Sequence, residues 1–317
     1  MSPATVVRSI WLDEDDAHDQ IGGKLRSGEI TAREAENLSK FADDGYLIIV
    51  AGVGADDAAD FDANVDRLWR EKPPKIAYAY DSPPRRLSRS DQLEHRRPRY
   101  RIHDMHSAFE TARRFYLDRT LLRYASLILD QPAVSTQSLY FEFGSQQALH
   151  RDSIVVPTPI FGELLAAWIA LEDIDPASGP LEYVPGSHKL PMFEFRPGQY
   201  MFDGSSMGEA EIRAAMKFHD DESAKRGLKT GRFLAKRSEV LIWHSALLHG
   251  GAAVSDEAKT RKSFVVHYST LRNHPARSIT LDEGGRSEVW TTRQLIDGEG
   301  VRGFANPLDG ELEYVRA

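Results

Sequence analysis

The sequence predicts a mainly β protein, a barrel or jelly roll flanked by helices. Three observations predict this class. The first 130 or so residues have the spacing of amphipathic helices, whereas short apolar runs alternate with turn residues from about residue 135 onward. Many short strands separated by turn signals are typical of barrels and jelly rolls. The length of 317 residues also suits one all-β domain with additions.

Helical signals come first along the chain. Thr31 and Glu34 have the spacing of a capping box, and the apolar residues behind it recur at helical spacing until residues 43–45 stop the helix. Residues 46–50 then predict a buried strand, and residues 56–69 predict another helix. A second capping box predicts one long amphipathic helix, which starts at Ser107 and Glu110 and carries Phe109, Ala112, Phe115, Leu122, Tyr124 and Leu127 on its apolar face.

Strand signals follow. The continuous apolar run 164–171 predicts a strand that is buried on both sides. Residues 192–228 are an expected insertion, with a helix at about 209–217. The remaining predicted strands are 138–143, 181–184, 232–235, 240–243 and 263–269.

We expect a single domain over residues 1–317. Its parts are a mainly helical segment, 1–132, and a jelly-roll core, 133–271, which contains the insertion. The tail, 272–317, is expected to wrap the barrel or cover its mouth.

Composition narrows the function classes. The net charge of −8 argues against generic binding to nucleic acid or membrane surfaces, and no stretch approaches the length of a membrane span. Cysteine is absent, which excludes disulfides, thiolate zinc sites, iron–sulfur clusters and a cysteine nucleophile. The first 11 residues lack the pattern of a secretory signal. We therefore expect a cytoplasmic protein; the sequence carries no signal for an oligomeric state.

An arginine run stands out in this acidic chain. Residues 85–101 contain seven arginines in 17 positions. Charge runs are usually solvated, so a loop with surface ion pairs is one interpretation. The other is an anionic substrate beside the active site, because arginine forks suit carboxylate and phosphate.

Two short stretches contain candidate metal ligands. His150 and Asp152 are two residues apart, so in a β-strand they would share a face. A third ligand must come from elsewhere, and His249 is the best candidate, 249 − 150 = 99 residues later. Two histidines and one carboxylate form the ligand set of non-haem Fe(II) oxygenases. The alternatives are a hydrogen-bonded His–Asp pair without a metal, and His244 in place of His249.

Several segments, in this order, carry a resemblance to a known family. They are Asp43-Asp44-Gly45-Tyr46-Leu47, His150-Arg151-Asp152, the stretch from Ser178 to Lys189 with Pro185-Gly186-Ser187-His188-Lys189, Leu247-Leu248-His249-Gly250-Gly251, Thr260-Arg261-Lys262-Ser263, and His267-Tyr268. The ordered set resembles the phytanoyl-CoA dioxygenase family of Fe(II)/2-oxoglutarate oxygenases. The match runs from about residue 38 to 270.

The resemblance implies a double-stranded β-helix, a cupin-like jelly-roll barrel with the metal at one mouth. It implies that His150, Asp152 and His249 hold Fe(II). It also implies that Arg261 pairs with the distal carboxylate of 2-oxoglutarate and that Trp168 lies on the wall near this co-substrate. Dioxygen is the second co-substrate.

Two departures from the family pattern are visible. Arg261 is 261 − 249 = 12 residues after the distal histidine, where 11 are expected, and Gly251 stands where a hydroxyl residue is common. For Arg261 the alternatives are Lys262 or a surface role, and for Trp168 the alternative is a plain core position. Ser187 and His188 are expected to be structural turn residues, whereas His267 would border the pocket if Arg261 faces inward.

The function implied is hydroxylation of an unactivated C–H bond in a small molecule, with release of succinate and CO2. The arginine run favours an anionic substrate. Asp152 fills the position that related halogenases leave for chloride, which favours hydroxylation. One alternative is another metal-dependent barrel enzyme, an isomerase or hydrolase, which would need neither Arg261 nor Trp168. The other is a non-catalytic barrel that binds a small ligand, which would not need the three ligands.

Overall fold

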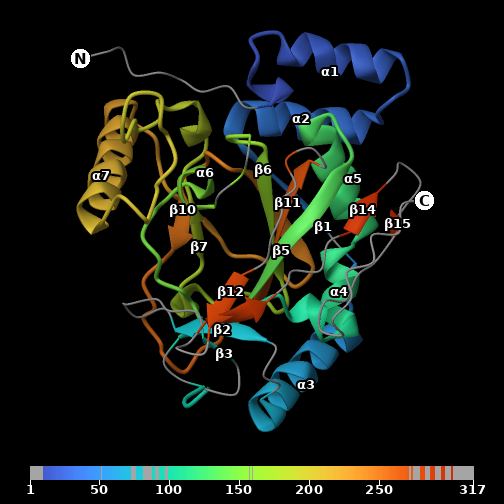
Figure 1. The fold of residues 1–317 in the computed structure, drawn as a ribbon. Coiled ribbons are helices and arrows are strands. Elements are labelled where there is room, and N and C mark those ends of the chain that lie inside the picture. Colours follow the sequence, from blue (N-terminus) through green and yellow to red (C-terminus); the bar gives the residue numbers. More distant parts are fainter. Residues whose placement is uncertain are drawn as a thin grey trace.

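The computed structural model places most of the chain. It describes residues 10–50, 52–72, 76–80, 88–89, 93–96, 99–156, 158, 160–270 and 273, and four short strands between residues 279 and 302. Figure 1 shows two sheets in the middle of the molecule, with helices around them.

The larger sheet is antiparallel throughout. Its strands follow in the order β1 (Tyr46–Val50), β9 (Glu239–His244), β6 (Leu164–Ala170), β11 (Ser263–Thr270), β5 (Ala133–Phe141), β4 (Tyr100–His103), β2 (Ala77–Tyr80) and β3 (Ser88–Arg89). The smaller sheet has the order β10 (His249–Gly251), β7 (Leu181–Tyr183) and β8 (Gly231–Phe233). In the C-terminal tail, β14 (Gln294–Ile296) pairs with β5 and with β15 (Val301–Arg302), while β12 (Ile279–Asp282) pairs with β13 (Arg286–Val289).

The larger sheet lies between two hydrophobic cores, one against each of its faces. Side chains alternate along a strand. One set, which includes Leu139, Trp168 and Val265, packs between the two sheets inside the barrel. The other set, which includes Phe264 and Val266, packs against the helices. Burial on both faces explains the continuous apolar run of β6, whose residues are all buried. The prediction of a mainly β jelly-roll fold is confirmed.

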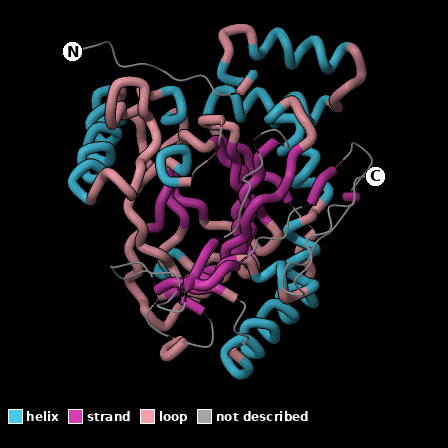
Figure 2. Tube along the Cα trace, in the orientation of Figure 1, coloured by secondary structure: helices cyan, strands magenta, loops and turns pink. Residues whose placement is uncertain are grey.

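Helices cover the outer face of the larger sheet (Figure 2). They are α1 (Ala17–Arg26), α2 (Ala32–Asp44), α3 (Ala55–Glu71), α4 (Glu110–Tyr116) and α5 (Arg119–Leu129), with the single turns η1 (Trp11–Asp13) and η3 (Met105–Ser107). The insertion carries α7 (Glu209–Lys225), which lies beside the smaller sheet. This helix is longer than the expected 209–217. Short turns complete the barrel: α6 (Asp152–Val155), η4 (Pro176–Ser178) and η5 (Ser187–Lys189). No helix in the described part of the chain combines the length and apolarity that crossing a bilayer requires.

Local signals set the boundaries of α2 and α3 as expected, but two predictions were wrong. β1 has the predicted bounds but is not buried throughout: Ile48 and Val50 are exposed, and among the described strands it pairs only with β9, as an edge strand does. The long helix expected from Ser107 is two helices. Asp118 interrupts it, because its carboxylate accepts a hydrogen bond from the backbone N–H of Leu121 and caps a new helix. The first of these helices, α4, has Phe109 as its N-cap and no side-chain cap, so the predicted capping box of Ser107 and Glu110 does not start it.

The end of α2 rests on the turn that contains His188. Gly45 ends the helix with φ of 78°, and a Cβ there would collide with the imidazole of His188. The backbone N–H of Gly186 donates to the carbonyl of Asp44 at 2.8 Å. Two segments of the sequence signature therefore contact each other, and the structural role expected for His188 agrees with this contact.

Candidate active site

Three candidate ligands meet at the mouth of the barrel. Suitable ligand atoms of His150, Asp152 and His249 all lie within 4.8 Å of one another. Asp152 Oδ1 is 3.7 Å from Nε2 of His150 and 3.5 Å from Nε2 of His249. Ligands about 2.1 Å from one ion are roughly 3 Å apart at neighbouring corners. The three side chains would therefore move closer together when they share an ion.

The backbone brings these residues together in a way that differs in part from expectation. His150 forms an isolated antiparallel bridge with His249, with N–H···O distances of 2.9 and 3.0 Å. Asp152 is not in a strand, because it begins the short helix α6. The extended backbone of Arg151, with φ of −115° and ψ of 131°, still turns His150 and Asp152 to the same side.

Each imidazole is oriented by a backbone carbonyl two residues earlier. Nδ1 of His150 lies 3.0 Å from the carbonyl oxygen of Ala148, and Nδ1 of His249 lies 3.0 Å from that of Leu247. A carbonyl only accepts, so both Nδ1 atoms carry a proton, and the neutral form of each ring has its lone pair on Nε2. Such a hydrogen bond on the far nitrogen is the usual support for a metal-binding histidine. In this structure the side-chain amide of Gln147 donates to Nε2 of His150 at 3.0 Å.

The charges suit a cation. Burial alone would raise the pKa of Asp152, but His249, His267 and His150 around it bring the pKa well below its usual value. Burial, and then the neighbouring His249, lowers the pKa of His150 to about 3. The carboxylate is therefore ionised and the imidazole of His150 is neutral at neutral pH, which are the protonation states that bind metal.

Gly250 is required by packing against the chain. A Cβ at this position would lie 2.5 Å from the carbonyl oxygen of Gln147. Gly251 is similarly crowded, since a Cβ there would lie 2.6 Å from Oγ of Ser145. The glycine pair thus lets β10 lie against the segment that precedes His150.

Arg261 and Trp168 lie together deeper in the barrel. Arg261 is 2% exposed, and its guanidinium donates to the carbonyl of Gly179 at 3.3 Å. The guanidinium carbon Cζ lies 5.7 Å from the ring centroid of Trp168 and 5.6 Å from that of Phe141. Lys262, the rival candidate, points to α3 instead, where its Nζ pairs with Asp62 at 2.8 Å.

One cavity of about 180 Å³ connects these groups. His150, Asp152, His249, Arg261 and Trp168 all line it, so the structure brings together every site residue predicted from the sequence.

The cavity also contains residues that the sequence did not assign. Arg101 and His103 on β4 line it together with Gln137 on β5, and His267 does so as the alternation along β11 predicted. Both ring nitrogens of His103 are buried, without a hydrogen-bond partner among the described residues. Burial, and then Arg101, lowers the pKa of His103 to about 3.

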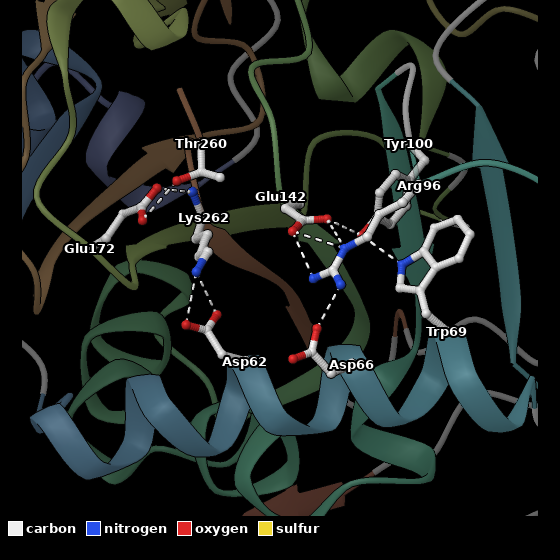
Figure 3. A network of polar contacts seen from close by, with 9 residues as sticks. All are labelled: Asp62, Asp66, Trp69, Arg96, Tyr100, Glu142, Glu172, Thr260 and Lys262. Atoms are coloured by element: carbon white, nitrogen blue, oxygen red, sulfur yellow. Dashed lines mark hydrogen bonds and ion pairs between the residues drawn. The ribbon is translucent and has the colours of Figure 1, made fainter. Parts of the chain in front are cut away.

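The arginine run divides between the two interpretations. Arg96 is structural, because it binds Glu142 at 2.8 Å and Asp66 of α3 at 2.6 Å (Figure 3). Arg101 faces the cavity, and Arg99 lies 3.6 Å from Glu257. Arg85, Arg86 and Arg97 lie outside the described residues.

Figure 3 also shows Lys262, just before β11, reaching Asp62 of α3. Glu142 accepts hydrogen bonds from Arg96 and from the hydroxyl of Tyr100, and its backbone carbonyl accepts from the N–H of Arg261 at 2.8 Å. Next to Arg261, the backbone N–H of Lys262 donates to Glu172 at 2.8 Å. The start of β11 is therefore held on both sides.

His244 lies outside the site. Its Nε2 is 3.4 Å from Asp13, and its Nδ1 accepts from the backbone N–H of Ala246 at 2.9 Å. The preference for His249 over His244 agrees with this geometry.

Comparisons with known proteins agree with the fold. A family model described as phytanoyl-CoA dioxygenase (PhyH) matches residues 41–263. The peroxisomal phytanoyl-CoA dioxygenase of Mus musculus is 24% identical over 285 residues, which cover 86% of this chain and 78% of that protein. The corresponding protein of Rattus norvegicus is 23% identical over 291 residues, covering 87% and 79%.

Two solved structures have the same overall fold. The epimerase SnoN, in complex with Fe3+, alpha ketoglutarate and nogalamycin RO, superposes with a TM-score of 0.56 at 18% identity, covering 85% of this chain and 98% of that one. EctD from S. alaskensis with bound Fe gives 0.53 at 19% identity, covering 84% and 82%.

Proposed function

Because the chain belongs to the phytanoyl-CoA dioxygenase family, we propose that it is an Fe(II)- and 2-oxoglutarate-dependent oxygenase that hydroxylates a small anionic molecule. The observation that carries the proposal is the convergence of His150, Asp152 and His249, within 4.8 Å, in a cavity that also contains the buried Arg261. The three candidate ligands alone, or Arg261 alone, would not favour a keto acid as ligand, but the combination does.

The three ligands would hold iron through Nε2 of both histidines and one oxygen of Asp152. The other sites of the ion stay open for substrates. When bound, iron supplies the activation of dioxygen: 2-oxoglutarate, O2 and R–H become succinate, CO2 and R–OH. The residues of the chain fix the ligands, exclude bulk water and place the C–H bond.

Arg261 would bind the distal carboxylate of 2-oxoglutarate. Its guanidinium is always charged and matches a carboxylate in two-pronged geometry. The rings of Trp168 and Phe141 flank that charge at 5.7 and 5.6 Å. An apolar surround strengthens the ion pair, because less water screens it.

The polar wall formed by β4 and β5 favours an anionic primary substrate. Arg101 supplies a permanent positive charge, and His103 and Gln137 supply hydrogen bonds on the same wall. Burial keeps His103 neutral, so it offers one donor and one acceptor. A carboxylate or phosphate on the substrate would meet these groups while its reacting carbon faces the ligands.

Hydroxylation is favoured over halogenation because Asp152 occupies the third ligand position. Proteins that share this fold also catalyse other reactions, since SnoN is an epimerase. The same site could therefore support a different oxidation of the substrate, and product analysis distinguishes the two.

The test is a screen for succinate release with small carboxylates and phosphates, using the full chain with Fe(II), 2-oxoglutarate and air. We expect at least one compound to raise succinate formation and to gain one oxygen atom, as detected by mass spectrometry. Asp152→Ala should abolish both. Full hydroxylating activity in Asp152→Ala would disprove the ligand assignment.

A further inference from the structure

The two oxygens of Asp152 lie in different surroundings. Oδ1 faces the ligand nitrogens, at 3.7 Å from His150 and 3.5 Å from His249. Oδ2 points away from them and accepts a hydrogen bond of 2.9 Å from the indole N–H of Trp243. His267 Nε2 is also on the Oδ2 side, at 3.7 Å. The carboxylate is therefore held in one orientation, with one oxygen turned to the protein.

Trp243 is fixed on three sides. It lies on β9, where its neighbours across the sheet are Tyr46 on β1 and Ala166 on β6. The side chain is 3% exposed, and its ring packs on the imidazole of His249, with centroids 4.6 Å apart. An alanine opposite leaves room for the large indole inside the barrel. Trp243 thus contacts two of the three candidate ligands at once.

We propose that Trp243 is a positioning residue that holds Asp152 as a one-oxygen ligand. This inference rests on the proposed function. An indole N–H can only donate, so it engages one lone pair of Oδ2 and orients the carboxylate with Oδ1 toward the ion. A carboxylate that bound iron through both oxygens would take a further coordination position. The keto acid needs two positions and dioxygen needs one, so a two-oxygen Asp152 would compete with them.

The hydrogen bond should also affect metal affinity. Groups that orient a ligand typically change metal affinity by about 10- to 100-fold when they are removed. Both ends of this bond are buried, with Asp152 5% and Trp243 3% exposed, so water cannot readily replace the indole. Loss of the N–H should therefore both weaken metal binding and free Oδ2 to turn toward the ion.

The experiment compares Trp243→Phe with the wild type, using Co(II) as the probe in the full chain. Calorimetry measures affinity, and the visible Co(II) absorption reports coordination number. We expect Trp243→Phe to bind Co(II) about 10- to 100-fold more weakly. Its visible bands should lose intensity, as they do when the coordination number rises. Trp243→Phe that is loaded anaerobically with Fe(II) should also bind 2-oxoglutarate more weakly than wild type. The intensity of the charge-transfer band during a 2-oxoglutarate titration measures this.

Trp11→Phe is the matched control. The indole N–H of Trp11 donates to the carbonyl of Leu127 at 3.0 Å, far from the ligands in the sequence and outside the cavity. This variant also loses an indole hydrogen bond, but one to a part-buried backbone carbonyl, and should keep wild-type Co(II) affinity and spectrum. If the loss of any indole hydrogen bond changed the Co(II) affinity and spectrum, Trp11→Phe and Trp243→Phe would show the same change.

A second replacement guards against misfolding. Benzothienylalanine at position 243 has sulfur in place of the N–H and nearly the same ring size, so packing on His249 is retained. It should reproduce the spectral change of Trp243→Phe. Wild-type affinity and spectrum in both position-243 variants would overturn this proposal while leaving the proposed function intact. Absence of Co(II) and 2-oxoglutarate binding in the wild type would overturn both.

Discussion

Arg151 and Arg261 are both at most 2% exposed, but one is enclosed by a turn and the other faces the cavity. Arg151 stands between two candidate ligands in the sequence, a position that would suit a role in binding. Its guanidinium instead donates to the carbonyls of Ser187, at 2.7 Å, and Pro191, at 3.2 Å. Burial lowers its pKa to about 9, so it is still charged at neutral pH.

Arg261 differs in what surrounds its charge. Aromatic rings flank it, and the carbonyl of Gly179 accepts from it at 3.3 Å. The comparison shows that burial alone does not identify a binding arginine. Several carbonyl acceptors around the guanidinium indicate a structural brace, whereas a cavity in front of it leaves room for a ligand, as we propose for Arg261.

Replacement of Arg151 should have the largest effect on stability. Arg151→Met keeps the length of the side chain but removes the guanidinium that donates to the carbonyls of Ser187 and Pro191, so we expect a loss of about 3 kcal/mol in the free energy of unfolding. Chemical denaturation measures it. The affinity of the folded variant for 2-oxoglutarate should stay within about threefold of wild type. A stable Arg151→Met protein that no longer binds 2-oxoglutarate would reverse the roles of the two arginines.

Arg261→Gln should show the opposite pattern. Loss of the charged fork should weaken 2-oxoglutarate by about 2–3 kcal/mol, or roughly 30- to 150-fold. Titration of the anaerobic Fe(II) protein with 2-oxoglutarate measures this. The free energy of unfolding without ligands should change little. Unchanged 2-oxoglutarate affinity would show that another residue anchors the keto acid.

The neighbourhood of Arg151 should also be sensitive to acid. Burial, and then Arg151, lowers the pKa of His219 to about 2. Between that pKa and about 6.5 the unfolded chain binds the proton and the folded protein does not, so stability falls as pH falls. From pH 7 to 5, His219→Gln should lose about 2 kcal/mol less than wild type. Equal losses in the two proteins would contradict a neutral His219 in the fold.

Arg261→Lys tests the shape of the cationic group rather than its charge. A lysine keeps the positive charge but lacks the planar fork, so affinity for 2-oxoglutarate should fall only about tenfold. The same anaerobic titration applies. A loss as large as that of Arg261→Gln would mean that geometry, and not charge, carries the interaction.

The smallest effect is expected at the neighbour of Arg261. Lys262 pairs with Asp62 of α3, and the two side chains are 22% and 47% exposed. Exposed pairs contribute at most about 1 kcal/mol. Asp62→Asn should therefore lower stability by less than that and leave 2-oxoglutarate affinity unchanged. A clear loss of affinity would show that α3 positions Arg261 through its neighbour.

Much of the site could be predicted because it depends on local patterns. His150 and Asp152 are close in sequence, and alternation along β11 put His267 on the same face as Arg261. The apolar run of β6 reported burial on both faces. Spacing alone could not show that Asp152 begins a helix, but the extended Arg151 preserved the predicted outcome.

The remaining features depend on long-range pairing. β4 lies beside β5, which places Arg101 opposite Phe141 and His103 opposite Leu139, and no local pattern specifies that register. The arginine run therefore looked uniform, although Arg96 and Arg101 have different surroundings. The break before Asp118 was missed because one apolar face continues through both helices, and only the cap distinguishes them.

In the proposed site, three side chains hold one ion, and an arginine beside them anchors a keto acid. Anaerobic addition of 2-oxoglutarate to the Fe(II)-loaded protein tests this directly. We predict a weak visible charge-transfer band that saturates with 2-oxoglutarate, and that is absent in His249→Ala and shifted to much higher 2-oxoglutarate concentrations in Arg261→Gln. A wild-type protein that shows no such band would contradict the account.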